Sequence, residues 1–90
     1  MSNTKSPNRI RNEQYAKYLE AVCRDTVPTV SLTFYEFKDM AKQMEDILLP
    51  SYVGGEGSRK EAWAAWVKVA GSSAEARRIF QAVDAITPMT

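Results

Sequence analysis

Residues 32–48 read LTFYEFKDMAKQMEDIL, and this stretch carries the strongest structural signal in the 90-residue chain. Thr33 and Glu36 have the spacing of a capping box, in which each side chain hydrogen-bonds the backbone N–H of the other residue. Leu32 and Phe37 flank the box at the spacing of a hydrophobic staple. The pattern predicts that a helix begins immediately after Thr33.

The apolar residues of this stretch recur at intervals of three and four, which is the period of one face of an α-helix. They are Phe34, Phe37, Met40, Ala41, Met44, Ile47 and Leu48. Pro50 ends the helix, because proline lacks a backbone N–H and disfavours helical geometry in the residue before it. We therefore expect an amphipathic helix over 34–48.

Two more Ser-x-x-Glu patterns follow, at Ser58 with Glu61 and at Ser72 with Glu75, and they predict helices over about 59–70 and 73–86. The apolar faces of these helices comprise Ala62, Trp63, Trp66, Val67 and Ala70, then Ala76, Ile79, Phe80, Val83 and Ile86. Gly71 is a typical helix terminator. The short connection makes the last two helices neighbours, as in a helical hairpin or a helix-turn-helix.

The N-terminal part predicts a disordered polar tail over 1–7 and then a helix over about 8–26. The apolar face of this first helix holds Tyr15, Tyr18, Leu19 and Val22. Residues 27–32 include a proline and predict an extended connector, whereas residues 50–57 hold three of the four glycines and predict a flexible loop.

These elements together predict an all-α fold: one compact four-helix domain over 8–88. It has an extended connector after the first helix and a glycine-rich loop between the second and third helices. No apolar run approaches the about 18 residues of a membrane span, and the N-terminus resembles no signal peptide. We expect a cytoplasmic protein with no membrane partner.

Composition argues against catalysis, because the chain contains no histidine and only one cysteine. Cys23 stands between apolar neighbours, so we expect it to be a small buried residue. The adjacent acids Glu45 and Asp46 project about 100° apart on a helix, which is unsuitable for a cooperating acid and base. The sequence therefore predicts no enzyme, no cofactor and no metal site.

An acidic stripe on the outer face of 34–48, together with the following loop, is the first binding hypothesis. Its candidate partner-binding residues are Glu36, Asp39, Gln43, Asp46, Tyr52 and Val53. Acids in the last turn of this helix oppose the helix dipole, and such local violations often mark functional surfaces. We expect a non-catalytic protein-binding module: an inhibitor, adaptor or assembly component, of the kind found among phage or mobile-element accessory proteins. The partner is another protein, with homo-oligomerisation as a further possibility.

A helix-turn-helix-like regulator that binds nucleic acid through the last two helices is the alternative hypothesis. Its candidate residues are Arg59, Lys60, Arg77, Arg78 and Gln81. The match to the motif is partial, since Arg77 stands where an apolar residue is expected after the turn glycine. The alternative takes Arg77, Arg78 and Gln81 to point outward from the last helix.

Overall fold

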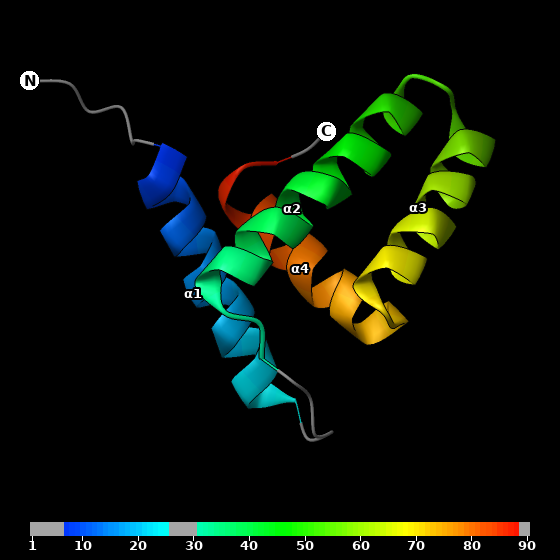
Figure 1. The fold of residues 1–90 in the computed structure, drawn as a ribbon. Helices are drawn as coiled ribbons and strands as arrows, with labels where there is room; N and C mark the ends of the chain where they lie inside the picture. Colours follow the sequence, from blue (N-terminus) through cyan, green and yellow to red (C-terminus); the bar gives the residue numbers. More distant parts are fainter. Residues whose placement is uncertain (1–6, 26–30, 89–90) are drawn as a thin grey trace, which may run out of the picture.

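The computed structural model describes residues 7–25 and 31–88, and this part of the chain folds into four α-helices without any strand. The helices are α1 (Pro7–Arg24), α2 (Phe34–Leu48), α3 (Glu56–Ala70) and α4 (Ser73–Ile86), with a short 3-10 helix, η1 (Leu49–Tyr52), after α2 (Figure 1). The predicted all-α, four-helix fold is confirmed. Residues 1–6 of the predicted tail, residue 26 of the predicted first helix and residues 27–30 of the predicted connector lie outside the described residues.

The bounds of α1 differ slightly from the predicted 8–26. The helix starts at Pro7, which the sequence assigned to the tail. Proline is well tolerated in a first turn, because the N–H that it lacks would have no helical partner there. At the other end, the backbone N–H of Asp25 donates to the carbonyl oxygens of Ala21 and Val22 at 3.2 and 3.3 Å, which closes the last turn.

Helix α4 is the element around which the others assemble. It contacts α1, α2 and α3, and its most extensive contacts are with α1, so the first and last helices of the chain pack together. Helices α2 and α3 run side by side in opposite directions, joined at one end by η1 (Figure 1). The last two helices are neighbours, as their short connection predicts.

The core forms where the apolar faces of the four helices meet. Its fully buried members are Tyr18, Phe37, Ala41, Met44, Leu48, Trp66, Ala76, Ile79, Ala82 and Val83. Most of them belong to the faces predicted from periodicity. Trp66 also joins two helices directly, because its indole Nε1–H donates to the carbonyl oxygen of Ala76 at 3.1 Å.

The capping box predicted at the start of α2 is present in full. The hydroxyl of Thr33 accepts from the N–H of Glu36 at 3.2 Å, and the Glu36 carboxylate accepts from the N–H of Thr33 at 2.9 Å. The hydrogen bond from the Thr33 backbone N–H, followed by one from the Thr33 side chain, lowers the pKa of the Glu36 carboxyl group. The hydrogen bond from the Thr33 backbone to the Glu36 side chain is therefore stronger while Glu36 is ionised.

The capping box predicted at Ser58 is wrong, because α3 begins at Glu56 and Ser58 lies inside the helix. Gly55 has φ +91°, a left-handed conformation that other residues rarely adopt. Its carbonyl oxygen accepts from the N–H of Arg59 at 3.1 Å, which closes the first turn. The acidic Glu56 suits this turn because it faces the positive end of the helix dipole.

The third box is half formed. The hydroxyl of Ser72 accepts from the N–H of Glu75 at 3.1 Å, as predicted. The Glu75 side chain, however, is buried and pairs with Arg78 at 3.3 Å. The spacing of the box identified the start of α4 but not the partner of its glutamate.

Two glycines, one in the first turn of α3 and one immediately after its end, are expected to change the stability of the domain in opposite directions when replaced by alanine. A Cβ at Gly57 would meet open space, so Gly57→Ala should stabilise the domain by about 0.5–1 kcal/mol through the higher helix propensity of alanine. Gly71 ends α3 at φ +98°, where alanine is strained, so Gly71→Ala should destabilise it by about 1 kcal/mol. Urea unfolding followed by circular dichroism measures both; a destabilised Gly57→Ala variant would contradict a helix start at Glu56.

Two tyrosines of α1 hold the chain where it enters α2. The Tyr15 hydroxyl donates to the carbonyl oxygen of Leu32 at 2.8 Å, and the N–H of Leu32 donates to the Tyr18 hydroxyl oxygen at 3.3 Å. Burial raises the pKa of the Tyr18 hydroxyl above its ordinary value, and the neighbouring Glu75 carboxylate raises it further. Tyr18 is therefore held in its neutral form.

We expect the Tyr18 hydroxyl to make stability depend on alkaline pH. An unfolded tyrosine loses its proton near pH 10, whereas the folded protein retains the Tyr18 proton to higher pH. The contribution is fully present below about pH 10 and is lost above it, with a slope of up to about 1.4 kcal/mol per pH unit. Urea unfolding from pH 8.5 to 11 measures the slope. Tyr18→Phe should flatten it; an unchanged slope in this variant would exclude Tyr18 as the cause.

Candidate functional site

An open groove with an apolar floor lies where the end of α2, η1 and the start of α3 meet one side of α4. Its volume is about 590 Å³, and the residues that line it are Leu48, Ser51, Tyr52, Glu56, Arg59, Lys60, Trp63 and Phe80. We call it the aromatic groove. Four separate elements contribute to it, so no single segment of sequence outlines it.

The floor of the aromatic groove is held by ring packing and by the turn of η1. The rings of Trp63 and Phe80 meet edge to face, with their centroids 5.6 Å apart, and both side chains are half-buried. The Ser51 hydroxyl donates to the carbonyl oxygen of Leu48 at 2.6 Å, which helps to fix the turn that carries Tyr52. The floor is therefore held by α3 and α4 through Trp63 and Phe80, and by η1 through Tyr52.

The rim of the aromatic groove is cationic. Arg59 and Lys60 are both exposed, and the side chain of Arg59 has no hydrogen-bond or ion-pair partner in the described part of the chain. Lys60 lies 3.9 Å from Glu56, but the two side chains are 79% and 82% exposed, so this pair is weak. The rim thus presents one unpaired and one loosely paired cation beside an aromatic floor.

Two further apolar side chains, which adjoin groove residues in the sequence, are exposed. Val53, next to Tyr52, is 92% exposed, and Leu49 is 42% exposed. Of the predicted loop residues, Val53 is thus open to solvent, whereas Tyr52 is half-buried in the groove floor. Apolar periodicity does not distinguish Trp63 and Phe80 from core residues, because each belongs to the apolar face of its helix.

The predicted acidic stripe on α2 is engaged in local contacts. Glu36 caps the helix, Asp39 accepts from the Gln43 side-chain amide at 2.8 Å, and Asp46 pairs with Lys42 at 3.0 Å. These contacts are solvent-exposed and individually weak. The stripe is therefore a mixed polar surface in which lysine and amide groups offset the acids.

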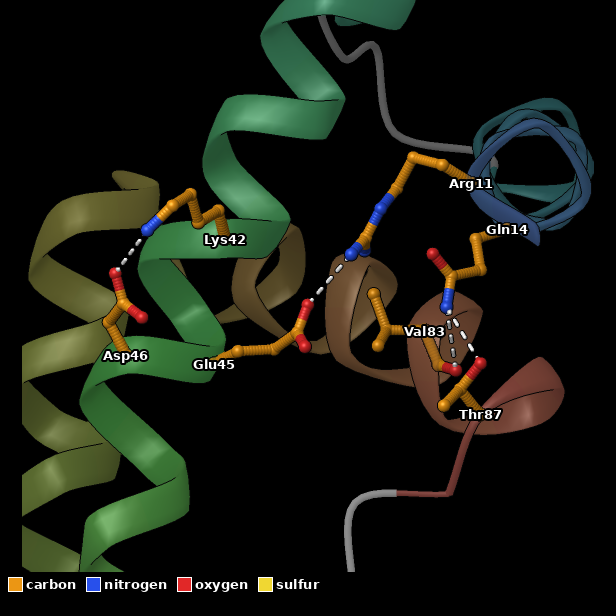
Figure 2. A network of polar contacts seen from close by, with 7 residues as sticks. All are labelled: Arg11, Gln14, Lys42, Glu45, Asp46, Val83 and Thr87. Atoms are coloured by element: carbon orange, nitrogen blue, oxygen red, sulfur yellow. Dashed lines mark hydrogen bonds and ion pairs between the residues drawn. The ribbon is translucent and has the colours of Figure 1, made fainter. Parts of the chain in front are cut away.

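The acids at the end of α2 separate into two environments. Glu45 reaches α1, where Arg11 lies 2.9 Å from its carboxylate, while Asp46 and Lys42 pair on another side of the helix (Figure 2). Arg11 accounts for the unfavourable placement of Glu45 against the helix dipole. Glu45, one of the two acids whose placement suggested a binding surface, therefore helps to join α1 and α2.

A buried amide joins α1 to α4 beside this ion pair. The Gln14 side chain is 1% exposed, and its Nε2 donates to the Val83 carbonyl oxygen at 3.4 Å and to the Thr87 hydroxyl at 3.3 Å (Figure 2). The apolar periodicity of α1 does not single out this glutamine. The available signal was its position four residues before Tyr18, which places both on one helix face.

The five predicted nucleic-acid-binding residues line two different grooves. Arg59 and Lys60 belong to the aromatic groove, whereas Arg77, Arg78 and Gln81 line a groove of about 420 Å³ between α1 and α4, with Arg24 and Asp25. We call the second one the α1–α4 groove. Arg77 and Gln81 are exposed as predicted.

The prediction that Arg78 points outward is wrong. The residue is 8% exposed, and its guanidinium group pairs with the carboxylates of Asp25 and Glu75. Packing of α4 against α1 buries this position, which a pattern read on α4 alone does not reveal. Cys23 is a second correction: it is exposed on α1 rather than buried.

No protein-family model, curated protein or solved structure matches this chain. Among the described helices, none combines the length and the hydropathy that crossing a bilayer requires. The candidate sites must therefore be judged from their own geometry and chemistry.

Proposed function

We propose that this protein is a non-catalytic protein-binding module and that the aromatic groove is its docking site. The observation that carries the proposal is an open apolar floor of Trp63, Phe80 and Tyr52 beside the Arg59 side chain, which has no partner among residues 7–25 and 31–88. Aromatic and arginine side chains are enriched among the residues that dominate binding energy at protein interfaces. The role is that of an inhibitor, adaptor or assembly component acting in the cytoplasm without a cofactor.

The build of the groove suits recognition of a partner segment. Its volume of about 590 Å³ lies within the range of ligand pockets, about 300–1,000 Å³, and accommodates a few side chains. Its floor is held by α3, α4 and η1, so little conformational entropy is lost when a partner docks. The exposed Leu49 and Val53 add apolar surface along the same chain segment.

Nucleic-acid binding remains the second candidate function and is favoured by the α1–α4 groove. Arg24, which the sequence pattern did not single out, lines this groove with Arg77 and Gln81. Asp25 lines it as well and offsets part of the positive charge. If this function is correct, duplex or single-stranded nucleic acid should bind at low salt, and Arg24→Ala with Arg77→Ala should reduce the salt dependence of the affinity. Absence of binding at low salt would exclude it.

Site-specific photocrosslinking tests the protein-binding proposal in cells of the native host. A benzoylphenylalanine in place of Tyr52 reports on the aromatic groove, and the same residue in place of Tyr35, which is 80% exposed on α2, is the matched control. We expect a discrete adduct from position 52 and none from position 35. An adduct from position 35 alone would move the interface to α2, and no adduct from either position would contradict the proposal.

A further inference from the structure

We propose that the occupant of the aromatic groove is an acidic segment of a partner protein, with bulky apolar side chains on the floor and carboxylates against Arg59 and Lys60. This inference rests on the proposed function, because it specifies the chemistry of the partner at the same site. It combines two features of the groove that favour different chemical groups: the apolar floor favours apolar side chains, and the cationic rim favours carboxylates.

The floor requires an apolar occupant. Trp63, Phe80 and Tyr52 are all half-buried, so each retains surface that a docked side chain can remove from water. Burying that surface is favourable because apolar area is removed from water. A purely polar or inorganic anion would leave it exposed.

The rim selects for negative charge. The Arg59 side chain has no partner in the described part of the chain, and its guanidinium group has the planar fork that binds carboxylates through two parallel hydrogen bonds. Lys60 is the second cation, and its 3.9 Å contact with the exposed Glu56 is readily exchanged for a partner carboxylate. A basic segment would meet repulsion from both cations.

Two other occupants fit less well. A nucleic-acid backbone would bring a dense row of phosphates to a site that has only two cations along with Glu56. A second copy of this chain would offer the outer face of α2, where Lys42 accompanies Asp46 and would be repelled by Arg59 and Lys60. An acidic segment from a different protein satisfies both the floor and the rim.

Selection from a random peptide-display library tests the inference for a partner whose identity is not established. The wild-type protein is the bait, and enriched peptides are synthesised and titrated into ¹⁵N-labelled protein. We expect enriched peptides to combine aspartate or glutamate with leucine, phenylalanine or tryptophan. Their binding should shift the amide signals of Tyr52 and Arg59 and the indole signal of Trp63.

Charge-reversal variants provide the matched comparison. Arg59→Glu with Lys60→Glu should weaken the binding of the selected peptides about tenfold, since two exposed ion pairs are lost and two repulsions are introduced. Arg77→Glu, an exposed arginine on the α1–α4 groove, should leave the affinity unchanged. Circular dichroism confirms that each variant is folded.

The outcomes separate the two proposals. Peptides that shift the groove signals but show no acidic bias, or that bind the Arg59→Glu/Lys60→Glu variant equally well, would overturn the acidic partner and leave the docking site intact. Peptides that shift only signals elsewhere, or a selection that enriches nothing, would overturn both. Enrichment of basic peptides at the groove would contradict the charge argument directly.

Discussion

Replacing Trp66 with alanine is expected to lower the free energy of unfolding by about 3–5 kcal/mol, since it removes a large, fully buried side chain and leaves a cavity. The substitution also removes the hydrogen bond from the indole to the carbonyl oxygen of Ala76, which joins α3 to α4. A domain of this length has a total stability of only about 5–13 kcal/mol. Thermal unfolding should show a melting temperature lower by more than about 12 °C.

The matched control for this prediction is Trp66→Phe. Phenylalanine retains most of the ring volume but has no N–H to donate, so the expected loss is about 1–2 kcal/mol. The difference between the two variants measures packing separately from the hydrogen bond. If Trp66→Ala is no more destabilising than Trp66→Phe, Trp66 does not hold the core together as its burial indicates.

Replacing Arg78 with methionine is expected to destabilise the domain by about 3–5 kcal/mol, because it leaves the Glu75 carboxylate buried without its cation. The side chain of Glu75 is 11% exposed and that of Asp25 is 38% exposed, so Glu75 accounts for the larger share. Urea unfolding at neutral pH measures the effect.

Two controls distinguish the loss of the buried charge pair from a general effect of substitution on α4. Arg77→Met changes an exposed neighbour of the same type and should alter stability by less than about 0.5 kcal/mol. Adding Glu75→Gln to Arg78→Met should restore part of the stability, since the uncompensated charge is removed. A double variant that is as unstable as the sum of its single variants would contradict this explanation.

The aromatic groove shows why the candidate site was only partly predictable. Tyr52, Arg59 and Lys60 were identified from the sequence, but Tyr52 was assigned to protein binding and the two cations to nucleic-acid binding. The structure places all three around one groove, together with Trp63 and Phe80. A sequence pattern reports on one helix at a time, whereas this groove forms only when α3 packs beside α4.

The buried polar residues that sequence patterns did not reveal have a common physical explanation. Gln14, Glu75 and Arg78 are buried, yet each is a residue type that is usually exposed. Glu75 pairs with Arg78 on its own helix, whereas Gln14 and Arg78 are stabilised by partners outside their helices, at Val83 and Asp25 respectively. Such partners are distant in sequence, so no local rule identifies them.

The sequence by itself determined the helical class, the approximate extent of each helix and most of the core. Capping at Thr33 and Ser72, and apolar spacing such as that of Phe37 and Met44, depend on residues within a few positions of each other. The tertiary structure alone decided which charges are buried, which acids of α2 pair with α1 and where the aromatic groove opens. These outcomes depend on helices meeting across long separations in the chain, and local propensity contains no information about those contacts.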